Sequence, residues 1–215
     1  MALPIKDVPS PIDLRTQVDA RDWACTAMVK RPWRTEFFVR MAEEIARVNA
    51  RPLSILELGS GPGFLAEHLL STFPSSTYTA LDFSGAMHEL AKERLGPLTA
   101  RVTFVEADFR VAGWTEGLPS VDAVVTIQAV HELRHKRRAA AFYRDVRPLL
   151  RPSGMLLACD HFVGERGMTN SDLFMTPDEH NAAIQEGGFS AVELLMLKGG
   201  LVLFRAQGSN CPTTV

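Results

Sequence analysis

Three glycines at alternating positions, Gly59, Gly61 and Gly63, form the segment of the chain that is most informative about chemistry. They follow the short apolar run of residues 53–58 and precede residues 64–73, whose spacing favours a helix. Glycine lets the backbone take positive φ or lie against a ligand, and the first N–H groups of a following helix point at whatever occupies the loop. The segment therefore predicts a nucleotide-type binding site between a strand and a helix.

Two acidic residues near this loop bear on which ligand it binds. Residues 61–66 satisfy the GxGxx(G/A) pattern, so a dinucleotide with its pyrophosphate on the loop is one candidate. Glu57, two residues before the first glycine, disfavours a pyrophosphate but suits an ammonium or sulfonium ligand. Asp82 ends the next strand, 19 residues after Gly63, where a carboxylate can accept hydrogen bonds from two ribose hydroxyls.

Two histidines lie just past the ends of later strands, at the edge where open α/β sheets bind ligands. His131 follows the strand predicted over 121–127, and His161 follows the strand predicted over 154–159. Histidine titrates near neutral pH, so either could act as a general base on a hydroxyl or an amine. Alternatively, His131 packs at the start of a helix and His161 bonds to backbone. No metal site is expected from these two and Asp160, because adjacent residues rarely point the same way off a strand.

The elements that must position these residues alternate between strand and helix from residue 53 onward. Helices are predicted over 19–30, 33–49, 64–73, 85–95, 136–149 and from 177 to the glycine pair at 187–188, and strands over 53–58, 77–81, 102–106, 121–127, 154–159, 191–197 and 201–206. Such alternation gives a parallel sheet, while the glycines at 199–200 join the last two strands as a hairpin. The predicted fold class is α/β: a doubly wound, mostly parallel seven-stranded sheet with helices on both faces and an antiparallel C-terminal hairpin strand.

These motifs follow one another in an order typical of a known family. Over about residues 52–207 the sequence resembles the class I, Rossmann-like S-adenosylmethionine-dependent methyltransferases of the small-molecule type. The matching segments are Glu57-x-Gly59-x-Gly61-x-Gly63, Asp82, Ala107-Asp108-Phe109, Gln128-Ala129-Val130-His131-Glu132-Leu133, and Arg147-Pro148-Leu149-Leu150-Arg151-Pro152-Ser153-Gly154-Met155, where Ser153 replaces a glycine. The closing hairpin is similar to that family's reversed seventh strand, whereas nicotinamide-binding Rossmann domains normally end in a parallel strand.

The resemblance implies S-adenosyl-L-methionine as cofactor and methyl transfer to a small-molecule acceptor by in-line displacement. The implied cofactor-binding residues are Glu57, Gly59, Ser60, Gly61, Gly63, Asp82, Phe83, Met87, Asp108, Phe109 and Gln128. Structural roles stay open for some of them: helix packing for Phe83 and Met87, a helix N-cap for Asp82, and a loop cap for Asp108. The alternative functions are a non-catalytic methyltransferase-like binding or partner module, or an NAD(P)-binding oxidoreductase.

The acceptor pocket is expected between the start of the chain and the loop after the fifth strand. Residues 1–50 are predicted to form an N-terminal arm and helical cap over the active site, and residues 51–215 the methyltransferase domain. Apolar and aromatic pocket walls are expected from Trp23, Trp33, Phe37 and Phe162. The short lid suits a small acceptor, or a homodimer whose subunits share walls.

Composition narrows the setting in which the chain works. It has 215 residues, 46% hydrophobic and 22% charged, which is typical of a globular domain. Its net charge of −2 argues against nucleic acid as a partner, and the basic residues between 134 and 151 fit a solvated helix face. Three scattered cysteines without a CxxC pair disfavour a disulfide framework and a zinc site. Neither a signal segment nor a membrane span is evident, so a cytoplasmic location is expected.

Overall fold

The computed structural model describes residues 5–48 and 52–208, which build one seven-stranded sheet with the order β3-β2-β1-β4-β5-β7-β6. The strands are β1 (Ser54–Leu58), β2 (Thr77–Asp82), β3 (Val102–Glu106), β4 (Val121–Ile127), β5 (Leu150–His161), β6 (Phe189–Lys198) and β7 (Leu201–Gly208). Neighbours pair in parallel, except that β7 runs antiparallel to both β5 and β6. The predicted α/β fold class with a reversed C-terminal hairpin strand is confirmed.

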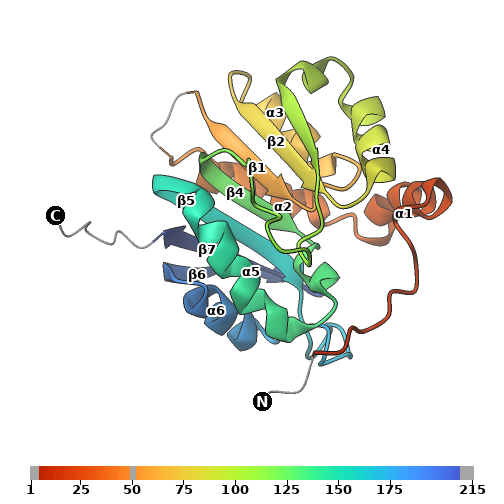
Figure 1. Cartoon of the computed structure of the whole chain (residues 1–215), viewed down its shortest axis with the longest axis vertical. Coiled ribbons are helices and arrows are strands. Elements are labelled where there is room, and N and C mark those ends of the chain that lie inside the picture. Colours follow the sequence, from red (N-terminus) through yellow and green to blue (C-terminus); the bar gives the residue numbers. More distant parts are fainter. Residues whose placement is uncertain (1–4, 49–51, 209–215) are drawn as a thin grey trace.

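The helices cover both faces of this sheet (Figure 1). They are α1 (Gln17–Lys30), α2 (Arg34–Ile45), α3 (Phe64–Thr72), α4 (Gly85–Leu95), α5 (Ala139–Val146) and α6 (Pro177–Glu186). Successive side chains of a strand point to opposite faces, so Ile55 packs with α2 and α3 while Leu56 packs with α5 and α6. All residues of β4 are buried, as expected for the centre of a parallel sheet.

The parallel strands bring their C-terminal ends to one edge of the sheet. The glycine loop follows β1, Phe83 follows β2, Gln128 follows β4, and His161 ends β5. The order of the sheet places β1 and β4 side by side at its centre, so loops far apart in sequence face one another there. The chain therefore builds its site from residues of several separate segments.

The chain after β4 departs from the predicted elements. The single helix predicted over 136–149 is instead α5 flanked by 3-10 turns at Lys136–Arg138 and Arg147–Leu149. Pro148 lies in the second of these turns and has no N–H to continue an α-helix. The next strand begins at Leu150 rather than at residue 154, with an irregular register against β4 and with Ser153 at a φ of +66°.

Smaller differences affect the helices at the start of the chain. Thr16 caps α1 by accepting the Asp19 N–H at 3.2 Å, so this helix begins two residues earlier than predicted. The helix predicted over 33–49 ends at Ile45, and residue 49 lies outside the described residues. These shifts leave the apolar face of α2 on the sheet, as its spacing predicts.

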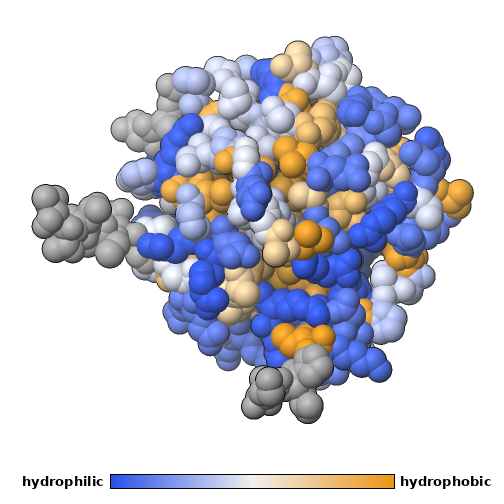
Figure 2. Space-filling view, in the orientation of Figure 1, coloured by the Kyte–Doolittle hydropathy of each residue, from blue (hydrophilic) through white to orange (hydrophobic). Residues whose placement is uncertain are grey.

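The surface mixes charged and apolar groups. Figure 2 shows hydrophobic residues near the middle of the viewed face with hydrophilic side chains around them. No helix in residues 5–48 or 52–208 is both long and apolar enough to cross a membrane. Cys25 is exposed and Cys159 buried, both as free thiols, while Cys211 lies outside the described residues.

Candidate active site

A cavity of about 510 Å³ opens at the C-terminal edge of the sheet. Its floor is formed by the ends of β1, β2, β4 and β5, and its walls by α1, α2, the segment before α1 and the loop after β5. The volume is that of a typical small-molecule site. Of the residues predicted to bind or react, those that line it are Trp23, Glu57, Gly59, Ser60, Gly61, Asp82, Phe83, Met87, Phe109, Gln128, His131 and His161.

The three loop glycines have positive φ but different surroundings. A Cβ on Gly59 (φ +73°) would meet the Ala129 Cβ at 2.2 Å, so this glycine lets two strand ends approach. A Cβ on Gly61 (φ +51°) would meet no atom within 4 Å, so its open side is available to a ligand. Gly63 does not line the cavity; a Cβ on it (φ +81°) would meet the Ala91 Cβ of α4 at 3.2 Å, so its role is close packing.

Asp82 ties the glycine loop to the end of β2. Its buried carboxylate accepts the Gly61 N–H at 2.7 Å and the Ser84 N–H at 3.0 Å. The N-cap of α4 is Ser84 rather than Asp82, because the Ser84 Oγ accepts the Met87 N–H at 3.1 Å. Burial raises the pKa of Asp82 to about 6, so the carboxyl is ionised at neutral pH.

Glu57 lies beneath the loop and is almost fully buried. The Tyr78 hydroxyl donates to its Oε2 at 2.8 Å. Burial raises the pKa of Glu57 to about 8, so most of these carboxyls hold a proton at neutral pH. The site beneath the glycine loop is therefore less negative than the sequence alone suggests. A cation bound beside Glu57 would lower the pKa of this carboxyl.

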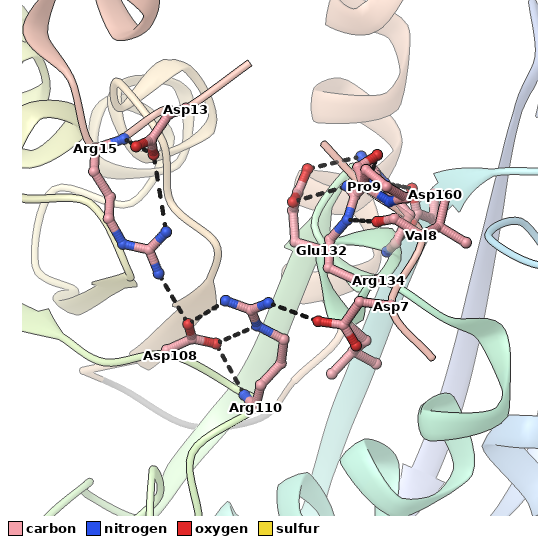
Figure 3. A network of polar contacts seen from close by, with 12 residues as sticks. Asp7, Val8, Pro9, Asp13, Arg15, Asp108, Arg110, Glu132, Arg134 and Asp160 are labelled. Carbon is pink, nitrogen blue, oxygen red and sulfur yellow. Dashed lines mark hydrogen bonds and ion pairs between the residues drawn. The ribbon is translucent and has the colours of Figure 1, made fainter. Parts of the chain in front are cut away.

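The segment before α1 covers the β2–β3 side of the site. Arg15 lies 4.7 Å from the centre of the Phe83 ring and bonds the Asp108 carboxylate at 3.0 Å. Arg110 holds the same carboxylate at 2.8 Å and lowers the pKa of Asp108 (Figure 3). Asp108 does not line the main cavity. It lines a neighbouring one, also of about 510 Å³, and its oxygens face arginines there.

His131 stands between two carboxylates. Its Nδ1 lies 2.7 Å from Asp160 Oδ1, and its backbone N–H donates to Asp160 Oδ2 at 2.7 Å. Its Nε2 lies 3.4 Å from Glu132 Oε1. Burial by itself would lower the pKa of His131, but the two acids outweigh burial and raise it, while the histidine cation lowers the pKa of Asp160 despite that group's burial. His131 is thus a cation at neutral pH whose orientation Asp160 fixes.

His161 differs electrostatically from its neighbour. The two imidazole rings lie 5.4 Å apart, and Gln128 Nε2 lies 2.8 Å from His161 Nε2. Burial lowers the pKa of His161 to about 4, so it is neutral at pH 7. No group of three or more His, Cys, Asp or Glu residues is arranged to hold a metal ion within the described ranges.

Three of the four residues predicted to wall the acceptor pocket lie elsewhere. Phe37 is fully buried in the core between α2 and the sheet, because its position on the helix points it inward. Phe162 packs in the core on the α5 and α6 side. Trp33 lies beside the β6–β7 turn, at Gly199. Only Trp23 lines the cavity.

Other wall residues are absent from the sequence-based set. They include Arg31, Arg34, Phe64, Asn170 and Leu173, together with residues 8–12 and 14 of the arm. The burial of Arg34 could have been predicted from spacing, because this residue lies three and four positions before Phe37 and Phe38, on the apolar face of its helix. The arm was predicted to lie over the active site, but it carries no periodic pattern, so the sequence did not indicate which of its residues line the cavity.

A family model for a methyltransferase domain matches residues 55–154. The chain is 31% identical over 134 residues to a malonyl-(acyl-carrier protein) O-methyltransferase of Paenibacillus sp. (strain JDR-2). That match covers 61% of the chain but 47% of the relative, so the chain spans about half the length of this curated relative.

Solved structures share the fold at low sequence identity. An O-methyltransferase family protein from Burkholderia thailandensis superposes with a TM-score of 0.69 at 20% identity, over 89% of this chain and 60% of that one. Human N-acetylserotonin methyltransferase, solved in complex with SAM, gives 0.69 at 16% identity, over 91% and 57%. The predicted resemblance to methyltransferases is confirmed over residues 55–154, which match a methyltransferase domain, and the solved methyltransferase structures share the fold of the chain.

Proposed function

We propose that this chain transfers a methyl group from S-adenosylmethionine to an oxygen of a small-molecule acceptor. The observation that carries the proposal is the single cavity that runs from Gly61 and Asp82 to His131 and His161. One end offers groups suited to a nucleoside and an ammonium, and the other offers groups that hold or move a proton. The name of the Paenibacillus relative supports oxygen as the methylated atom.

The residues at the β1–β2 end fit such a donor. Gly61 leaves its backbone open to a ligand, and the buried Ser60 Oγ has no hydrogen-bond partner among the described residues. Asp82 would accept the ribose hydroxyls, and Glu57 would lie near the ammonium. Phe83, Met87 and Phe109 would offer apolar surface to the adenine ring, with Gln128 close to the reacting end.

When bound, the donor supplies a methyl group already activated by a positively charged sulfur. The protein therefore has to align the acceptor and exclude water rather than generate a strong electrophile. Phe38, Phe64 and Phe174 give the cavity apolar walls suited to this. A cavity of about 510 Å³ suits a small acceptor better than a large protein substrate.

His131 is the residue we assign to proton transfer. Asp160 fixes its ring through Nδ1 and leaves Nε2 directed toward Glu132 in the cavity. The deprotonated ring would receive the hydroxyl proton of the acceptor at Nε2 as the new bond to carbon forms. Because the raised pKa keeps His131 protonated at neutral pH, turnover should increase as the pH rises toward that pKa.

The start of the chain acts in this proposal as the predicted cap. Val8 and Pro9 accept hydrogen bonds from the Arg134 guanidinium at 2.9 and 2.8 Å, and Asp7 pairs with Arg110 at 3.3 Å (Figure 3). Residues 8–12 and 14 line the cavity. These contacts support a cap that closes over the donor and separates it from solvent.

Calorimetric titration tests the donor assignment, with S-adenosylhomocysteine and NAD as the two ligands. S-adenosylhomocysteine should bind and NAD should not; the reverse result would overturn the proposal. Catalysis is tested by incubating radiolabelled donor with a panel of phenols, hydroxy acids and amines and measuring labelled product.

Two variants test the proton-transfer role. Replacing His131 by Gln should lower kcat on the best hydroxyl acceptor by about 100-fold, within the range of general-base catalysis. Asp160→Asn should shift the pH profile of kcat to lower pH, because the carboxylate that raises the His131 pKa is gone. An unchanged profile in Asp160→Asn would exclude His131 as the base.

A further inference from the structure

Arg94, in the last turn of α4, links this helix to the second half of the glycine loop. Its Nε donates a hydrogen bond to the Pro62 carbonyl oxygen at 2.9 Å, and its guanidinium carbon lies 3.9 Å from the centre of the Phe64 ring. Pro62 and Phe64 both line the main cavity, whereas Arg94 does not. The arginine therefore holds two wall residues of the cavity without being part of the wall.

The first half of the glycine loop is held differently, by the end of β2. The N–H groups of residues 59–61 donate to the Leu81 carbonyl oxygen at 2.8 and 2.9 Å and to the Asp82 carboxylate at 2.7 Å. Pro62 has no N–H group to donate, so its backbone can bond a neighbour only through its carbonyl oxygen. That oxygen is the group to which Arg94 donates.

The glycine that follows Pro62 lets α4 come close enough for this contact. A Cβ on Gly63 would meet the Ala91 Cβ at 3.2 Å and the Leu95 Cγ at 3.6 Å. Ala91 and Leu95 lie one helical turn apart, and Arg94 lies three residues after Ala91, on the same side of α4. The close packing at Gly63 therefore places the guanidinium of Arg94 beside the loop.

The same guanidinium positions the ring of Phe64. Phe64 is the first residue of α3 and is half-buried. A planar guanidinium stacks on an aromatic face and still donates hydrogen bonds in its own plane, which the ammonium of a lysine cannot do. Arg94 also pairs with Glu67 at 3.7 Å, but both side chains are partly exposed, and such surface pairs contribute little. The contacts with Pro62 and Phe64 are the ones that reach the cavity.

We propose that Arg94 is a positioning residue for the binding of the methyl donor. By fixing the Pro62 carbonyl and the Phe64 ring, it holds the loop in the conformation that leaves Gly61 open to a ligand. A loop that is already held in this conformation loses less conformational freedom when the ligand binds, so the affinity is higher. The inference rests on the proposed function, because it takes the ligand of the glycine loop to be S-adenosylmethionine.

Calorimetric titration with S-adenosylhomocysteine compares the wild-type chain with Arg94→Met and Arg94→Lys. Methionine keeps part of the apolar length of the side chain and removes both contacts, while lysine keeps the charge and a donor but cannot stack in the same way. Arg94→Met should raise the Kd by about 10-fold, the scale of one hydrogen bond from a charged donor. Arg94→Lys should give an intermediate Kd. An unchanged Kd in Arg94→Met would overturn the proposal.

Two matched variants separate positioning from general stability. Arg101 also donates to backbone carbonyl oxygens, of Leu70 at 2.7 Å and Phe73 at 3.0 Å, but these lie at the C-terminal end of α3 and do not line the cavity. Arg101→Met should lower the Tm and leave the Kd unchanged. Glu67→Gln, which removes only the ion pair with Arg94, should also leave the Kd unchanged. If either control raised the Kd as much as Arg94→Met does, the two wall contacts would not be the cause, and the proposal would be refuted.

Hydrogen exchange tests the same role in the chain without ligand. Peptides that cover residues 59–66 should exchange faster in Arg94→Met than in the wild-type chain, while peptides of β1 and β2 should exchange alike. Arg101→Met should not change the exchange of residues 59–66. Equal exchange of this segment in Arg94→Met and wild type would refute the positioning role. Faster exchange in Arg94→Met, together with a wild-type chain that does not bind S-adenosylhomocysteine, would instead refute the proposed function.

Discussion

Replacing Glu57 by Gln tests the electrostatics beneath the glycine loop. Glutamine keeps the size of the side chain and an oxygen that accepts from Tyr78, but it cannot ionise. In the wild-type chain, burial raises the pKa of Glu57 from 4.5 to about 8. A carboxyl with a raised pKa in the folded state stabilises the fold fully below its ordinary pKa, and this stability is lost progressively as the pH rises from 4.5 to about 8.

The expected magnitude follows from that shift. Each pH unit in the window is worth about 1.4 kcal/mol, so the free energy of unfolding should fall by about 3 kcal/mol between about pH 5 and pH 7.5 because of this one group. Glu57→Gln lacks the effect. Its stability relative to the wild-type chain should therefore improve by that amount over the same interval, whatever the other titrating groups contribute to both proteins.

Urea denaturation followed by circular dichroism, at several pH values, measures this difference. Glu67→Gln, at an exposed carboxylate of α3, is the matched control and should run parallel to wild type. S-adenosylhomocysteine should bind the wild-type chain more tightly as the pH rises toward 8, because its ammonium favours the ionised carboxylate, and Glu57→Gln should lose this trend. Parallel stability curves for Glu57→Gln and wild type would falsify the raised pKa.

Four further substitutions are expected to separate ligand binding from folding. Asp82→Ala should weaken S-adenosylhomocysteine binding by about 1.5–3 kcal/mol, the scale of charge-assisted hydrogen bonds, as measured by calorimetry; an unchanged Kd would exclude its ribose role. Gly59→Ala should lower the Tm, because the added Cβ would overlap Ala129; equal Tm values for this variant and wild type would contradict the close packing. Gly61→Val should leave a folded protein that no longer binds S-adenosylhomocysteine. Arg134→Ala should release the arm and speed limited proteolysis before α1 without unfolding the sheet, and unchanged cleavage would mean that other contacts hold it.

Local patterns were enough to predict the sheet and the donor end of the site. Apolar runs that end at Gly59 and at Asp82 mark strand exits, and parallel strands must bring those exits to one edge. The hairpin followed from two glycines between strand-like runs. The break of the helix around Pro148 was missed because a local apolar period continues through it, while the missing proline N–H acts only on the backbone.

The sequence by itself determined the fold class, the glycine loop and the acids near the C-terminal ends of the first two strands, because each depends on periodicity and on the backbone freedom of particular residues. The tertiary structure alone decided the ionisation of Glu57, the pairing of His131 with Asp160, and the burial of Phe37 and Phe162 in the core. These properties depend on which distant side chains meet and how far water is excluded from them, and neither is encoded in a local pattern.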